Sequence, residues 1–281
     1  MKKLLGLVSL SLFVAAPALA DPIAWSPPAS CPDGFTCGAL SARLAGHDND
    51  WPGAFVAAKR ACDFDALFCE DYAKLHVLAG PQRGGDPQRG LAMLEGMCMK
   101  DRAVCSTVAR MYDAPPRESG LARDSAKAER ILRDVCAHDD FLSCSTLGKL
   151  YLKGGPGVSV DPTKARKAYE DGCKGSDHYA AGVCGELADE LLKGSFGPPD
   201  RRAAAGYLER SCAQGYRCDL AVRVMLDDKD VERAKANALR GCERFYCAGI
   251  KEVGKVDPAW ADAKLRELCA RRRTDACRLL P

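Results

Sequence analysis

The residues with the most chemistry to offer in this 281-residue sequence are its sixteen cysteines. They fall into eight close pairs: Cys31 and Cys37, Cys62 and Cys69, Cys98 and Cys105, Cys136 and Cys144, Cys173 and Cys184, Cys212 and Cys218, Cys242 and Cys247, and Cys269 and Cys277. An even, dense set of this kind is typical of disulfides in an oxidising compartment. No CxxC or paired Cys/His spacing occurs, so the pattern does not indicate a zinc site.

The N-terminal residues predict export. Two lysines precede an apolar run of about 13 residues, and the small residues Ala18-Leu19-Ala20 follow as a cleavage site. We therefore expect a signal peptide over 1–20, followed by a short segment over 21–30. The run is shorter than the roughly 20 residues that span a bilayer. The expected location is the periplasm or the medium, without membrane insertion.

Charge and composition narrow the class further. Removing residues 1–20 takes two of the 41 basic side chains and none of the 38 acidic ones, which leaves a net charge of +1. A near-neutral protein is a poor electrostatic binder of nucleic acid or of membrane surfaces. With 28% charged residues, the chain fits a soluble protein. We exclude a cytosolic enzyme, a transmembrane protein and a disordered chain, and we expect a monomer.

The cysteine spacing also predicts the elements that position these residues. First members of successive pairs lie 31, 36, 38, 37, 39, 30 and 27 residues apart, which is typical of a solenoid of short repeats. Before Cys136, the residues Ala128, Ile131, Leu132 and Val135 share one helical face. The same register holds Ala165, Ala168 and Tyr169 before Cys173, and Ala204, Tyr207 and Leu208 before Cys212.

One register position carries only small residues. Eight residues before the first cysteine of a pair stand Ala54, Gly90, Ala128, Ala165, Ala204, Ala234 and Ala261. Small residues allow the backbones of neighbouring helices to approach closely. We therefore predict tight helix packing at this position of each repeat.

A second helix is predicted after the second cysteine of each pair. The third residue past that cysteine is apolar or aromatic, and the fourth is small: Tyr72 and Ala73, Val108 and Ala109, Leu147 and Gly148, Leu187 and Ala188. Asp65, Asp101 and Asp140 precede these helices as expected N-caps. Only two or three residues remain for the turn, so each repeat is predicted to be an αα-hairpin.

The hairpin turn would also allow the paired cysteines to bond. On one continuous helix, the Cα atoms of Cys98 and Cys105 would lie about 10.5 Å apart, whereas a disulfide tolerates about 6.8 Å. Counting alone leaves about two million pairings of sixteen cysteines open. The recurrence of one pair per repeat favours bonding within repeats.

Two segments resemble a known family. The sequence GGPGVSVDPTKA (154–165) is similar to the inter-repeat loop of Sel-one-like repeats, and CSTLGKLYLKG (144–154) to their second helix. One cysteine pair per hairpin resembles the exported, cysteine-rich subgroup of this tetratricopeptide-related family. The resemblance implies an all-α fold over 31–281, a right-handed α-solenoid of about eight disulfide-stapled αα-hairpin repeats. The first and last repeats, and the shortened spacings after 200, depart from the pattern.

The resemblance implies a scaffold that presents stacked helices to a peptide or protein. Some cysteine-rich members are described as penicillin-binding proteins with β-lactamase activity. The serine motifs S-x-x-K, S-D-N and K-T-G are absent, as are H-x-H-x-D and H-E-x-x-H. Ser106 and Ser145 follow cysteines at one repeat position, and we interpret them as structural because no base is evident beside them.

Other candidates have structural interpretations as well. His138 with Asp139, and His178 with Asp177, lie in turns between paired cysteines, and together would form an exposed metal site; solvated turn residues are the simpler interpretation. The acidic pairs Asp189-Glu190 and Asp227-Asp228 are interpreted as solvated charge, because neighbours on a helix point to different sides. Arg271-Arg272-Arg273 is interpreted as a solvated face, and the glycines at 84–85 and 154–157 as loop breaks.

Two hypotheses of function remain. The first is an exported, disulfide-rich repeat scaffold that binds a peptide or protein and has no metal, cofactor or catalytic residue. The second is a β-lactamase-like hydrolase, which rests on the resemblance alone.

Overall fold

The structure is a computed structural model that describes residues 31–138, 140–244 and 247–280. The predicted signal peptide and the segment 21–30 lie outside these ranges. The described residues form helices and turns, and their β-structure is limited to one isolated bridge between Gly155 and Val158. None of the described helices is both long enough and apolar enough to cross a membrane.

The helices pair into successive hairpins after an initial helix α1 (Gly34–Arg43). The first helices of the hairpins are α2 (Trp51–Phe64), α4 (Pro87–Cys98), α6 (Ser125–Cys136), α8 (Pro162–Gly172), α10 (Arg201–Ala213), α12 (Val231–Arg244) and α14 (Pro258–Ala270). The second helices are α3 (Cys69–Ala79), α5 (Cys105–Asp113), α7 (Phe141–Lys153), α9 (His178–Lys193), α11 (Cys218–Asp227), α13 (Ala248–Val253) and α15 (Thr274–Cys277). Short 3-10 or π turns occupy Leu44–Asp48, Ala66–Phe68, Pro81–Arg83, Arg102–Val104 and Arg117–Ser119.

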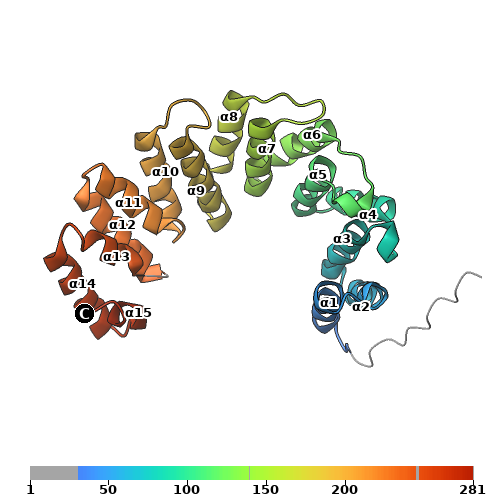
Figure 1. Cartoon of the computed structure of the whole chain (residues 1–281), viewed down its shortest axis with the longest axis horizontal. Coiled ribbons are helices and arrows are strands. Elements are labelled where there is room, and N and C mark those ends of the chain that lie inside the picture. The colour runs from blue at the N-terminus through green and yellow to red at the C-terminus, as the bar shows by residue number, and fades with distance from the viewer. Residues whose placement is uncertain (1–30, 139, 245–246, 281) are drawn as a thin grey trace, which may run out of the picture.

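The hairpins stand side by side along an arc (Figure 1). Each helix packs on the next in the chain, and the second helices of successive hairpins also touch, as α5 does α7 and α7 does α9. The loops 154–161 and 194–200, which connect hairpins, lie on the outer side of the arc (Figure 1). The turns within those hairpins are at the opposite helix ends and therefore face inward. The prediction of an all-α solenoid of αα-hairpins is confirmed.

The predicted apolar stripes form the core. Ala128, Leu132 and Val135 of α6 are buried, and so are Ala165, Ala168 and Tyr169 of α8. All seven small residues that stand eight positions before the first cysteine of a pair are buried. At Gly90, a Cβ atom would lie 2.5 Å from the carbonyl oxygen of Ala73 on α3. The prediction of close helix approach at this register is confirmed.

The predicted N-caps are confirmed, with one difference. Asp140 accepts hydrogen bonds from the N–H groups of Leu142 and Ser143 at the start of α7. Asp65 and Asp101 instead cap 3-10 turns, Ala66–Phe68 and Arg102–Val104, and the α-helix begins only at the cysteine that follows. A tight 3-10 turn satisfies the first backbone donors in fewer residues, which suits a very short connection.

A second series of aspartate N-caps, at the start of the first helices, was not predicted from the sequence. Twelve residues before the first cysteine of seven pairs stands an aspartate: Asp50, Asp86, Asp124, Asp161, Asp200, Asp230 and Asp257. Each accepts a hydrogen bond from the N–H three residues on, at 2.8–3.3 Å. These caps fix where every first helix begins, and extending the cysteine alignment by four residues would have found them.

Each of the eight disulfides joins the two cysteines of one close pair. The turn brings the Cα atoms of Cys98 and Cys105 to 4.6 Å. In seven pairs the bridge joins the end of a first helix to the second helix or to the turn before it. The pair Cys31 and Cys37 instead ties the residues before α1 to that helix. The end repeats thus differ from the others, and α15 is a single turn of four residues.

We expect this connectivity in the purified protein. Peptide mapping without reduction should recover eight links, each within one hairpin or at the start of α1, because only these sulfur atoms are brought together by a turn. A reduced and alkylated sample provides the control. Links that run mainly between hairpins, or several alkylated cysteines in the unreduced sample, would contradict the expectation.

Candidate functional site

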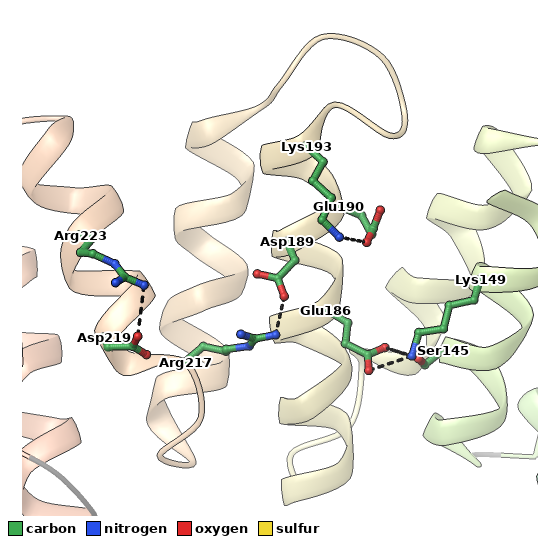
Figure 2. A network of polar contacts seen from close by, with 9 residues as sticks. All are labelled: Ser145, Lys149, Glu186, Asp189, Glu190, Lys193, Arg217, Asp219 and Arg223. Carbon is green, nitrogen blue, oxygen red and sulfur yellow. Dashed lines mark hydrogen bonds and ion pairs between the residues drawn. The ribbon is translucent and has the colours of Figure 1, made fainter. Parts of the chain in front are cut away.

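The serine interpreted as structural has a charged neighbour that the sequence did not reveal. The Ser145 hydroxyl on α7 donates a hydrogen bond to the Glu186 carboxylate on α9 (Figure 2). The ammonium of Lys149 lies 2.9 Å from the same carboxylate. A serine, a carboxylate and a lysine therefore meet, although Glu186 is 41 residues from Ser145 in the chain.

Whether a substrate can reach the Ser145 hydroxyl decides whether this cluster could be catalytic. Ser145 is only 3% exposed, so its oxygen is shielded from a substrate by α7 and α9. The Glu186 carboxylate also forms an ion pair with Lys149 and bridges α9 to α7. The equivalent Ser106 on α5 has no such partner and donates to the carbonyl oxygen of Ala103 at 3.3 Å. The Ser145–Glu186 bond joins the second helices of neighbouring hairpins, and the structural interpretation of both serines stays a prediction.

The charged network continues along the second helices. Asp189 pairs with Arg217 at the start of α11, whereas Glu190 pairs with Lys193 on its own helix at 2.6 Å (Figure 2). Burial raises the pKa of Glu190, but hydrogen bonds from Lys193 and Ser195 outweigh it and hold this pKa below its ordinary value. The two carboxylates point to different partners, as predicted for neighbours on a helix.

The second acidic pair is solvated, as predicted, with 70% of the Asp227 and 39% of the Asp228 side chain exposed, but its two carboxylates do not point to different sides. Asp227 and Asp228 both contact the guanidinium of Arg201 at the start of α10, at 3.2 and 2.9 Å. Helix α11 ends at Asp227, so Asp228 leaves the helical geometry that separates neighbours. The two carboxylates and the arginine tie the two helices of one hairpin together.

The candidate metal ligands serve local structure. Nδ1 of His138 lies 2.7 Å from the carbonyl oxygen of Asp134, and the ring of His178 lies against Tyr179 with 3.8 Å between ring centroids. Asp177 caps α9 by accepting the N–H of Ala180, and Asp139 lies outside the described residues. Within the described ranges, the one group of three metal-ligand types is Cys242, Cys247 and Asp275, and its two cysteines are joined in a disulfide.

The arginine run is only partly solvated, which corrects its interpretation. Arg271 pairs with Glu267 at 2.8 Å and is well exposed. Arg273 donates to the carbonyl oxygen of Cys242 on α12 and lies 3.6 Å from Asp275. It therefore ties the last hairpin to the preceding one. The two glycine segments are loop breaks as predicted, with positive φ at Gly84, Gly154 and Gly157.

A buried histidine on α3 was not singled out by its sequence context. His76 is 6% exposed, and its ring packs on Phe55 and Tyr72 with centroid distances of 4.8 and 4.9 Å. Nδ1 accepts the N–H of Asp86, the N-cap of α4. Burial lowers the pKa of His76, and the nearby Arg89 lowers it further, more than Asp86 raises it.

This shift predicts acid sensitivity near neutral pH. The unfolded chain protonates His76 near its ordinary pKa of about 6.5, whereas the folded protein resists the proton. Stability is therefore full above about pH 6.5 and decreases as the pH falls from there toward the lower folded pKa. Urea unfolding at pH 7 and at pH 5 should show the loss, and His76→Gln should reduce it. An equal loss in both proteins would contradict this.

The turn edge of the solenoid exposes large apolar side chains. They lie in or beside the disulfide turns of successive repeats: Phe35, Phe64, Leu67, Met99, Leu142, Tyr179 and Tyr216, each 40–90% exposed. The turns that carry Leu142, Tyr179 and Tyr216 face the inner side of the arc (Figure 1). Each of the first six cysteine-pair repeats thus contributes at least one apolar side chain to an extended edge, which we call the turn edge.

A groove of about 860 Å³ lies between the first helices α6 and α8. Leu147 and Tyr151 of α7 form its floor, and Arg133, Lys164 and Lys167 stand among its walls. The Tyr151 hydroxyl donates to Glu129 at 2.7 Å, and burial together with this bond raises the pKa of Tyr151. The groove combines an apolar floor with basic walls.

The chain is similar to two solved repeat proteins. A Sel1 repeat protein from Oxalobacter formigenes is 18% identical over 68% of this chain and 75% of its own, with a TM-score of 0.43. A protective antigen of uropathogenic Escherichia coli, which displays an SLR fold, is 14% identical over 88% of this chain and 59% of its own, with a TM-score of 0.36. No family model and no curated protein matches.

Proposed function

We propose that the protein is an exported, disulfide-stapled repeat scaffold that binds an extended segment of another protein along its turn edge. The predicted signal peptide and eight disulfides support export. The observation that carries the binding role is the row of exposed apolar side chains on that edge. Contiguous exposed apolar surface marks interaction sites, and an extended ligand that touches several of these side chains would join them into one apolar interface.

The repeat geometry suits an extended ligand. Each of the first six repeats contributes its own apolar side chain, so a ligand that runs along this part of the arc meets a similar contact at each repeat. The disulfides restrain the backbone of each turn, so little backbone freedom is lost on binding, which favours affinity. Charged side chains on the second-helix face are largely paired with one another (Figure 2) and stabilise the stack.

Single charges placed on the turn edge test the proposal. Linear peptides are first selected from a display library on purified, oxidised protein, and their affinity is then measured for Met99→Asp and Leu142→Asp. Losing one buried apolar contact should weaken binding about tenfold or more. Val160→Asp is the matched control, because Val160 is also exposed but lies on the outer loop. Equal affinity of all three variants would overturn the proposal.

The hydrolase hypothesis has a separate test. The purified protein should not turn over a chromogenic β-lactam, since Ser145 is buried against Glu186 and Lys149. Hydrolysis that survives repurification and disappears in Ser145→Ala would show that the scaffold interpretation is incomplete. Hydrolysis unchanged in that variant would indicate a contaminating enzyme.

A further inference from the structure

Two pairs of neighbouring first helices, α4 with α6 and α10 with α12, are joined by an ion pair at the same register. One partner lies three positions before the first cysteine of its repeat. The other partner lies nine positions before the first cysteine of the next repeat. Glu95 of α4 meets Lys127 of α6 in this way at 2.6 Å and also accepts the Tyr112 hydroxyl. Glu209 of α10 meets Arg233 of α12 through two contacts of 2.8 and 3.0 Å.

Between α6 and α8 the same two positions hold Arg133 and Lys164. Both side chains are cationic, so the interhelical pair cannot form, and both line the groove. Lys164 has one carboxylate contact, Asp161 at 3.5 Å on its own helix. The Arg133 guanidinium pairs with no carboxylate of the described residues.

The other interfaces between first helices do not place two unneutralised cations at these positions. Lys59 and Arg89 are also both cationic between α2 and α4, but Asp63 neutralises Lys59 at 2.6 Å. The equivalent of Asp63 after Arg133 is Ala137, which has no charge. Between α8 and α10, Glu170 binds Arg166 of its own helix at 2.8 Å. Only the groove therefore combines two facing cations with no carboxylate between them, among these first-helix interfaces.

The remaining charges of the groove add to the positive excess. Asp171 is held by both Lys167 and Lys174, each at 2.6 Å. Burial raises the pKa of Asp171, but these hydrogen bonds outweigh it and keep the pKa below its ordinary value. Glu129 is engaged by the Tyr151 hydroxyl. Four cations thus surround two occupied carboxylates.

We propose that the groove between α6 and α8 binds an acidic, extended segment of a partner protein. One carboxylate of the segment lies between Arg133 and Lys164 and completes the bridge that Glu95 makes one repeat earlier. An apolar side chain of the segment packs on Leu147 and Tyr151 in the floor. The groove reaches the disulfide turns at Ala137 and Lys174, but none of the seven exposed apolar side chains of the turn edge lines it.

Charge reversal at Arg133 provides the main test. Fluorescence anisotropy measures binding of a labelled peptide rich in Asp and Glu with a few leucines, beside a peptide in which Asn and Gln replace the acids. Arg133→Glu should weaken binding of the acidic peptide about tenfold to a hundredfold, because the new carboxylate takes the ligand's place. The Asn/Gln peptide should bind the unmodified protein weakly.

Matched controls separate the groove from general charge. Arg130→Glu makes the same change on an exposed residue of α6 outside the groove and should leave affinity within about twofold. Thr163→Trp should obstruct the groove, whereas Gln88→Trp, at the same register of α4, should not. Arg133→Glu should keep or raise the melting temperature of the protein.

Several outcomes would overturn the inference. These are equal weakening by Arg130→Glu and Arg133→Glu, equal binding of the acidic and the Asn/Gln peptides, or displacement of the acidic peptide by inorganic phosphate at a similar concentration. If Met99→Asp and Leu142→Asp still weaken library peptides, the proposed function stands without this site. If the turn-edge variants have no effect but Arg133→Glu does, only the groove binds.

Discussion

Replacing Cys136 and Cys144 together by alanine is expected to lower the free energy of unfolding by roughly 2–5 kcal/mol. The bridge joins the last residue of α6 to the first turn of α7 across a Cα distance of 4.7 Å. Removing it frees the connecting turn in the unfolded chain. It also removes packed sulfur at Cys144, which is 1% exposed. Urea unfolding of the oxidised proteins measures the loss.

The loss should also extend beyond one hairpin. Helix α6 packs on α5, and α7 packs on α8, so an opened hairpin uncovers both neighbours. Hydrogen exchange should therefore increase in α5 and α8 as well as in α6 and α7. The control is the double replacement of Cys31 and Cys37, where the effect should stay near α1. An unchanged melting curve, or exchange confined to α6 and α7, would contradict the expectation.

Replacing Gly90 by valine is expected to lower the free energy of unfolding by about 3 kcal/mol. A Cβ atom at this position would lie 2.5 Å from the carbonyl oxygen of Ala73 and 2.8 Å from the Cβ of His76. Both atoms belong to or adjoin the backbone of α3, which cannot move aside by a rotamer change. Helices α3 and α4 must separate, and this exposes the core between them.

The same helix contains the control for this prediction. Gly96 of α4 has no atom within 4 Å of its potential Cβ, so Gly96→Val should change stability by no more than about 0.5 kcal/mol. The comparison holds helix and residue types constant and varies only the packing. Similar melting temperatures for the two variants would show that α3 and α4 are less closely packed than in the structure.

Local periodicity accounts for what could be predicted from the sequence. The cysteine pairs, the apolar stripes and the small-residue register recur along the chain, and each describes contacts within a hairpin or with the next one. Such contacts follow from helix geometry, so the solenoid, its hairpins and the N-caps at Asp65, Asp101 and Asp140 could be predicted. The further N-caps, such as Asp86, also recur at one position relative to the cysteines, so the same alignment could have predicted them.

Side-chain partners that lie far apart in the sequence could not be predicted, since they depend on where helices end and on how they pack. Glu186 reaches Ser145 over 41 residues, and Arg201 brings Asp227 and Asp228 together because α11 ends between them. The groove forms only where α6 and α8 leave a gap and Arg133 meets no acid. The sequence by itself therefore determined the repeating hairpin, since its signals are local and periodic. Tertiary structure alone decided which charges pair and which remain open, because single substitutions at the interfaces break the repeat.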